Sequence, residues 1–281
     1  MDKWILSRLS ETVSICNTGL KTFDLTGATT SLFNFWLYEL CDYYIEFLKP
    51  SFYAQDQTDE QKIQFNNSRE CLYTCLDAGL RLISPFMPFI SEELFQRLPR
   101  RCPQTDAPSI VVSPYPTDTD YASFRSTELE MNVKLTQEAI NKIRSLRADY
   151  QLTPKTKTDM FVHYFDESIH KALVSFQDLI STMTNSKSVT FMNGQDQSAK
   201  IPIGCAFSTL SDKCKLYILL KGIIDTDKEE IKLKKKQQSL GQQIESLNKL
   251  MSSATYETKV PEEVRQKNTE KVNCFLFIQI Y

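Results

Sequence analysis

The sequence predicts a mainly helical protein: an antiparallel helical bundle with a small α/β layer and a C-terminal coiled-coil hairpin. Apolar residues recur three and four positions apart over residues 3–21, 31–50 and 60–83, which is typical of helices that bury one side. Strand-like stretches are short and gather between residues 159 and 220. Near the C-terminus, leucines repeat every seven residues, as in a coiled coil: Leu233, Leu240 and Leu247.

Residues 31–50 predict the central helix of the bundle. Two apolar stripes run side by side along it, so most of its circumference is expected to be buried. The first stripe contains Leu32, Trp36, Leu40, Tyr43 and Phe47, and the second contains Phe33, Leu37, Tyr44 and Leu48. Glu39, Asp42 and Glu46 line the remaining strip, which would repel phosphate and is expected to face solvent or ion pairs. Pro50 is expected to end the helix, because its ring removes a backbone donor.

The rest of the bundle is predicted from local signals. Asp24 can cap the helix that follows it, and Pro88 can open a short helix that ends at Leu98. Residues 103–127 are rich in Pro, Ser, Thr and Asp, and they include an apolar run, Ile110–Val112, that could form one short strand. We therefore expect the first domain, the helical bundle, to span residues 1–128.

Residues 129–222 are expected to form a small α/β subdomain, and residues 223–281 an arm. The subdomain should contain helices at 129–148 and 168–184 and strands at 159–165, 188–192, 201–207 and 215–220. In the arm, Asp225 can cap a long helix, and Pro261 can start a returning one. The last eight residues are nearly all apolar and break the pattern, so the hairpin looks cut short.

Composition excludes several classes of protein. The net charge of −2 is divided as −6 over residues 1–128, +3 over 129–222 and +1 over 223–281, so a bound polyanion would be held on local patches. No apolar run approaches the roughly 18 residues of a membrane span, and no signal core is visible, so we expect a cytoplasmic protein. None of the 8 cysteines lies in a Cys-x-x-Cys pair, which favours reduced structural thiols and no metal site.

Five motifs carry a family resemblance. They lie at Phe35 to Pro50, Ser84 to Phe95, Ile143 to Tyr150, Gly222 to Asp225 and Lys259 to Val264. In this order the motifs resemble valyl-tRNA synthetases, and the resemblance is closest to the cytosolic eukaryotic form. It covers residues 2 to about 272, which correspond to the C-terminal anticodon-binding and hairpin-arm region.

The resemblance implies a tRNA-binding region whose partner is a valine-accepting tRNA, with no DNA and no membrane involved. The full enzyme would join valine to tRNA with ATP and Mg²⁺, in a catalytic domain normally present in cis. The family's His-Ile-Gly-His and Lys-Met-Ser-Lys-Ser signatures are absent from this sequence. We therefore expect no catalytic residue, cofactor site or metal site in this chain, and no ligase activity from it alone.

Three basic clusters are candidate RNA contacts, each with a plainer alternative. The first cluster, Arg97, Arg100 and Arg101, could bind phosphates through the paired N–H donors of its guanidinium groups, or it could be a solvated helix end. The second cluster, Arg144 and Arg147, matches a family motif and could contact RNA, or it could form surface ion pairs. The third cluster, Lys232, Lys234, Lys235 and Lys236, could contact tRNA phosphates, or it could be the solvated surface of a coiled coil. The competing function is a non-catalytic helical module that binds other proteins and no RNA.

Overall fold

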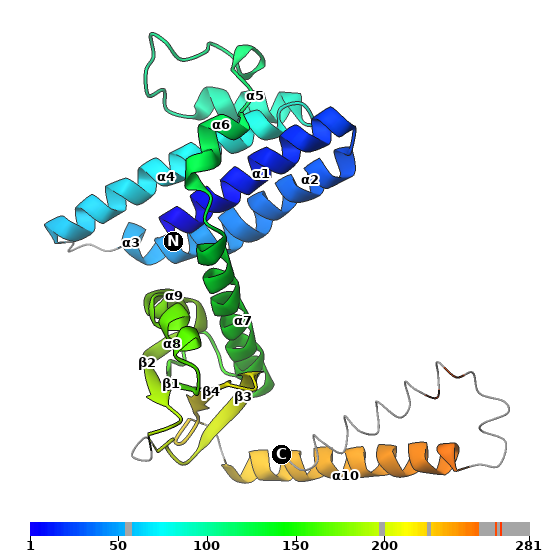
Figure 1. The fold of residues 1–281 in the computed structure, drawn as a ribbon. Coiled ribbons are helices and arrows are strands. Elements are labelled where there is room, and N and C mark those ends of the chain that lie inside the picture. Colours follow the sequence, from blue (N-terminus) through cyan, green and yellow to red (C-terminus); the bar gives the residue numbers. More distant parts are fainter. Residues whose placement is uncertain (54–57, 197–199, 224–225, 253–261, 263–264, 266–281) are drawn as a thin grey trace. The chain divides into compact units, whose positions relative to one another are not determined.

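The computed structural model describes residues 1–53, 58–196, 200–223, 226–252, 262 and 265; within 226–252, it describes the side chains at 234, 238, 239 and 241–252. Residues 1–219 form one compact unit and residues 220–281 a second. The prediction of a mainly helical protein with a small sheet is confirmed (Figure 1). The domain boundaries at 128 and 222 stay a prediction.

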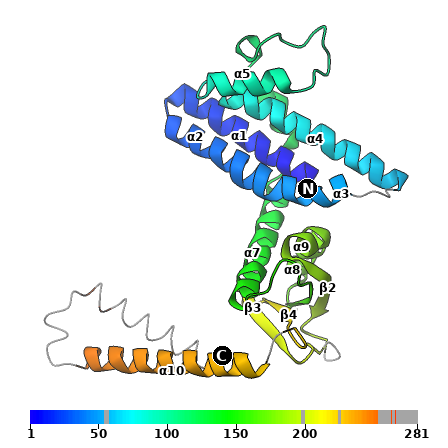
Figure 2. The same ribbon diagram turned by 180° about the vertical axis from the view of Figure 1, so that it is seen from behind.

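The first unit begins with a bundle of long helices. Helix α1 packs against α2, the segment η1 and α4, as Figures 1 and 2 show from opposite sides. Ile5, Leu9 and Val13 of α1 are completely buried at this contact. The bounds are α1 Asp2–Thr22, α2 Leu25–Phe33, η1 Asn34–Ile45, α3 Glu46–Tyr53, α4 Asp59–Ile83, α5 Pro88–Arg97, η2 Ile110–Val112, α6 Asp118–Tyr121 and η3 Ala122–Phe124.

The central helix does not follow the α-helical period throughout. Residues 34–45 wind as a π-helix, in which each amide bonds the carbonyl five residues back. Phe35 is completely buried although it belongs to neither predicted stripe, whereas Phe33 is 55% exposed and Leu37 is 39% exposed. The predicted second stripe is therefore wrong in its first half, because the wider winding changes which residues face the core.

The prediction that Pro50 ends this helix is wrong. Helix α3 contains Pro50 and continues to Tyr53. A proline ring holds φ near the helical value, so a short continuation needs only the loss of one backbone hydrogen bond.

Other local signals are confirmed, with one exception. The Asp24 carboxylate accepts a hydrogen bond from the Gly27 amide (3.0 Å), which caps α2 as expected. The prediction that Pro88 opens a short helix is also confirmed, since α5 begins at Pro88. A capping box between Thr58 and Gln61, which was not predicted, starts α4. The exception is Ile110–Val112, which forms a 3-10 turn and no strand. The Glu92 carboxylate accepts from the Ile110 amide (2.8 Å) and so holds this turn against α5.

A four-stranded sheet with the strand order β2-β1-β4-β3 completes the first unit. Strand β1 pairs in parallel with β2 and antiparallel with β4. The crossover from β1 to β2 contains two helices where one was predicted, because the backbone leaves helical geometry at Phe176 (φ −120°, ψ 24°). The bounds are α7 Thr127–Asp149, β1 Thr158–Tyr164, α8 Glu167–Val174, α9 Gln177–Thr184, β2 Ser186–Asn193, β3 Cys205–Ser211 and β4 Cys214–Leu219.

The second unit contains helix α10, Thr226–Met251. Ile244, on this helix, is buried (8% exposed). The predicted cap Asp225 and most of the predicted returning helix lie outside the described residues. Among the helices that the structure describes, none is long and apolar enough to cross a membrane.

Candidate nucleic-acid interface

The three arginines of the first basic cluster lie at the end of α5 and just beyond it. Arg97 is exposed and pairs with Glu93 one helical turn earlier (Nη2 to Oε1, 2.5 Å). Pairs of this kind at an exposed site stabilise by less than about 1 kcal/mol, so the Arg97 guanidinium can readily exchange its partner.

Arg100 and Arg101 are held more firmly than Arg97. The Arg100 guanidinium lies 4.4 Å from the centre of the Phe95 ring and donates to the Ala107 carbonyl (2.8 Å). The Arg101 guanidinium lies 3.9 Å from the centre of the Tyr73 ring and donates to the Glu70 carboxylate (2.7 Å). Both side chains line an open cavity of about 280 Å³ between α4, α5 and the following loop. The structure thus brings two of the three predicted arginines to one cavity, each stacked on an aromatic ring.

Arg144 and Arg147 share a helix but not an environment. Arg144 donates from Nε to the Met183 carbonyl (2.9 Å), which links α7 to α9. Arg147 is only 6% exposed, and it donates to the Thr158 hydroxyl (3.0 Å) and to the carbonyls of Thr153 and Thr156 (3.1 and 2.6 Å). Burial lowers the pKa of the Arg147 guanidinium. These hydrogen bonds let Arg147 link α7 to the start of β1 and to the loop before it. RNA contact by either arginine stays a prediction.

Replacing Arg147 with methionine is expected to lower the free energy of unfolding by about 2 kcal/mol, because three oxygen acceptors lose a charged donor. Arg147→Lys should restore little, since an ammonium cannot reproduce the fork that reaches all three. Urea unfolding of both variants, with Lys142→Met on the same helix as an exposed control, measures the effect. Equal stability of Arg147→Met and the control would contradict this role.

The third basic cluster lies on α10. The side chain of Lys234 is exposed. The side chains of Lys232, Lys235 and Lys236 lie outside the described residues, so contact between any of the four and RNA stays a prediction.

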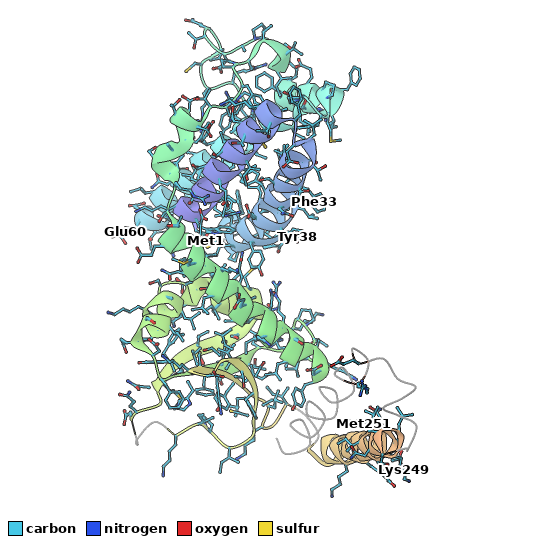
Figure 3. All side chains as sticks on the ribbon, turned by 45° about the vertical axis from the view of Figure 1, so that its right-hand side comes forward. Met1, Phe33, Tyr38, Glu60, Lys249 and Met251 are labelled. Carbon is cyan, nitrogen blue, oxygen red and sulfur yellow. The ribbon has the colours of Figure 1, made fainter. Side chains whose placement is uncertain are left out.

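A larger cavity that the sequence did not predict lies between α1, η1 and α7. Its volume is about 730 Å³, and its lining includes Trp4, Tyr38, Tyr43, Gln137 and Asn141. Tyr38 packs edge-on against Phe33, with 5.7 Å between ring centres, at the margin of the bundle (Figure 3). No spacing rule could have found this site, because its residues come from helices about 100 positions apart in the chain.

An ion network forms one wall of this cavity. Arg8 pairs with Glu39 (2.7 Å), with Glu130 (3.1 Å) and with Glu11. Arg125 also pairs with Glu11 (2.8 Å) and Glu130 (3.2 Å). Burial raises the pKa of the Glu39 carboxyl although Arg8 opposes the shift, and Glu39 Oε2 has no hydrogen-bond partner. The prediction that Glu39 faces an ion pair is therefore confirmed.

The described residues offer no metal-binding cluster at these surfaces. No cluster of three or more His, Cys, Asp or Glu side chains that could hold a metal ion occurs among them. His170 stacks flat on Tyr164, with 4.3 Å between ring centres, and burial lowers the pKa of His163. Cys71 and Cys75, one helical turn apart on α4, are both free and buried. The arrangement offers arginine side chains stacked on aromatic rings and two open cavities. These features suit ligand binding.

Comparison with known families assigns most of the chain. Residues 2–162 match the family model described as the anticodon-binding domain of tRNA ligase. Residues 225–276 match the model described as the valyl tRNA synthetase tRNA binding arm. The two matches follow each other in the order in which the bundle and the arm were predicted.

Individual relatives agree with this assignment. The chain is 40% identical to the valine–tRNA ligase of Takifugu rubripes over 271 residues, which is 96% of this chain and 22% of that protein. It is 42% identical to the enzyme of Caenorhabditis elegans over 272 residues, 96% of this chain and 25% of that protein. The mitochondrial enzyme of Mus musculus is 35% identical over 258 residues, 92% of this chain and 23% of that protein. The chain thus spans about a quarter or less of the length of these relatives.

The resemblance expected from the five motifs is therefore confirmed. The first family model covers more than half of the chain, from α1 into β1. The chain belongs to the family of anticodon-binding domains of tRNA ligases, and over nearly all of its length it is similar to the valine-specific members.

Proposed function

We propose that these 281 residues act as the tRNA-binding region of a valine–tRNA ligase, with valine-accepting tRNA as the partner. The bundle would lie at the anticodon end of the tRNA and the arm at its outer corner. One observation carries the proposal: an anticodon-binding model and a tRNA-binding-arm model match in succession along a chain about 40% identical to valine–tRNA ligases.

Joining valine to tRNA would be the work of the larger part of the ligase, which this chain does not cover. ATP and Mg²⁺ would act there. The residues described here do not fit such a group, because no set of three potential metal ligands gathers among them and the sequence has no glycine-rich phosphate loop among its 7 glycines. No catalytic step is therefore assigned to this chain.

We propose a cytoplasmic site of action. The relatives whose names lack the word mitochondrial are 39–42% identical to this chain. The mitochondrial ones are 34–36% identical. This difference favours the cytosolic form of the enzyme, in agreement with the motifs.

For the contacts themselves, we propose that the α5 cluster holds tRNA phosphates. Arg97 and Arg101 are exposed, and each is paired with a single exposed carboxylate that a phosphate could replace. Arg100 would brace the surface through its contacts with Phe95 and Ala107. Arg144 and the four α10 lysines remain further proposed contacts. Arg147 would first have to leave its three oxygen partners.

Titrating the chain with valine-accepting tRNA at two salt concentrations tests the proposal. Binding should weaken several-fold from low to moderate salt, because phosphate contacts release counterions. The double variant Arg97→Gln, Arg101→Gln should flatten the salt dependence by about 0.7–0.9 logarithmic units per lost phosphate contact. Arg69→Gln, at an exposed position on α4, is the matched control and should leave the slope unchanged.

No detectable tRNA binding, even at low salt, would contradict the proposal and favour the alternative of a protein-interaction module. If the chain binds tRNA but the double variant shows the same salt dependence of binding, the proposed function stands, and the phosphate contacts lie elsewhere than on the α5 cluster.

A further inference from the structure

The sheet of β1–β4 has one covered face and one open face. The side chains of Met160, Val162, Leu216 and Ile218 are completely buried, and Tyr164 on the same side of β1 stacks on His170 of α8. This side of the sheet is therefore the one that the helices cover. Alternate residues of β1 and β4 point to the other side and remain partly exposed.

Strand register aligns aromatic rings on the open face. Phe161 of β1 lies opposite Tyr217 of β4, which lies opposite Phe207 of β3. Neighbouring strands are about 4.8 Å apart, so the three positions form a row roughly 10 Å wide. In the next row, His163 lies opposite Lys215. The face therefore carries a band of rings with one cation among them.

The rings form a continuous surface. The centres of Phe207 and Tyr217 are 5.8 Å apart, and those of Tyr217 and His163 are 6.3 Å apart. Lys215 Nζ lies 5.9 Å from the centre of the Phe207 ring, and 42% of Phe207 is exposed. Burial and the charge of Lys215 lower the pKa of His163, so this ring is uncharged at neutral pH and Lys215 supplies the positive charge.

We propose that this open sheet face, defined by Phe161, His163, Phe207, Lys215 and Tyr217, stacks unpaired nucleobases of the bound RNA. Aromatic side chains on an open sheet suit bases that have left a helix, and a lysine among them suits the phosphate between two bases. Charge favours RNA over an apolar protein surface, because residues 129–222 carry a net charge of +3 while the bundle carries −6. The inference rests on the proposed function, since it takes tRNA as the RNA that reaches this face.

A tryptophan placed in the band reports on stacking directly. The native tryptophans, Trp4 and Trp36, both lie in the bundle. Phe207→Trp in the full chain should therefore show fluorescence quenching when tRNA or a short single-stranded oligouridylate is added. Val111→Trp, at a position 79% exposed beside the bundle, is the matched control and should not be quenched by the oligonucleotide.

Affinity gives an independent measurement. Phe207→Leu should weaken oligonucleotide binding about fivefold or more, the loss typical of one removed stacking ring. Phe52→Leu is the same substitution at a similarly exposed aromatic site on α3 (43% exposed), and it should leave binding unchanged. Since Phe207 is partly exposed on an edge strand, circular dichroism should show both variants folded.

The outcomes separate the inference from the proposed function. tRNA binding without quenching at position 207 and without loss in Phe207→Leu would overturn the role of the sheet and leave the proposed function standing. Quenching by the oligonucleotide in a chain that does not bind tRNA would keep the stacking surface and overturn the proposed function. Binding of neither RNA would overturn both.

Discussion

Replacing Arg8 with methionine is expected to lower the free energy of unfolding by about 3 kcal/mol at neutral pH. Arg8 is the cation that Glu39, Glu130 and Glu11 share, and the two most enclosed carboxylates are only 15% and 13% exposed. Removing one partner of a buried pair leaves an uncompensated charge, which costs about 3–5 kcal/mol in enclosed sites. The lower end of that range applies, because the Arg8 side chain itself is 24% exposed.

The loss in Arg8→Met should shrink as the pH falls from neutral to about 5. Burial already raises the pKa of Glu39 in the folded protein, and removing Arg8 raises it further. A carboxyl whose pKa is higher in the folded state than in the unfolded state binds more protons when folded, so its contribution to stability increases as the pH falls. Urea unfolding of both proteins at the two pH values measures this.

The double variant Arg8→Met, Glu39→Gln is the control for this explanation. It removes the carboxylate together with its cation, so it should be more stable at neutral pH than Arg8→Met alone. A stability difference between the native protein and Arg8→Met that stays constant with pH would contradict the electrostatic account and point to lost packing of the arginine stem.

Replacing Gly79 with leucine is expected to lower the free energy of unfolding by about 3 kcal/mol, through overpacking. A Cβ atom at position 79 would lie 2.8 Å from Cζ2 of Trp36 and 3.1 Å from its Cε2. These atoms belong to a rigid indole ring wedged between η1 and α4, so the helices would have to separate.

A double-mutant cycle with alanine tests this reason. With Trp36 present, Gly79→Ala should destabilise. In a Trp36→Leu background the same change should stabilise by up to about 1 kcal/mol, because alanine favours a helix over glycine. The same sign of effect in both backgrounds would contradict the steric explanation. Thermal unfolding of the four proteins is sufficient.

The elements that the sequence predicted well depend on local patterns. Helices α1, α4 and α7 begin and end within two residues of their predicted positions, because each buries one stripe at the α-helical period. The cap at Asp24 is likewise local, since its carboxylate reaches an amide three residues away.

The elements that the sequence did not predict depend on winding or on distant partners. The π-helical turns moved Phe35 into the core and left Phe33 outside, and an α-helical period could not foresee this. Strand β3 begins at Cys205 and not at Ile201, since Gly204 before it takes a positive φ of 92° and Ile203 is 89% exposed.

The candidate site was predicted less completely than the fold. Arg100 and Arg101 do share a surface, as their closeness in the chain suggested, but Arg97 does not line it. Arg144 and Arg147 are three positions apart on α7, yet the loop at Thr153–Thr156 folds over Arg147 and buries it. The large cavity beside α1 is lined by residues up to 137 positions apart in the chain, Trp4 and Asn141, so only the folded chain reveals it.

The π-helical stretch Asn34–Ile45 also has a consequence for comparing relatives. Wider winding fits an extra residue into the same axial length, so a homologue one residue shorter here could adopt ordinary α-winding and still deliver Leu48 to the core. An alignment should therefore tolerate a single gap between positions 34 and 45. Beyond such a gap, residues of the two proteins that occupy the same place in the structure would differ by one in their distance along the chain from position 34.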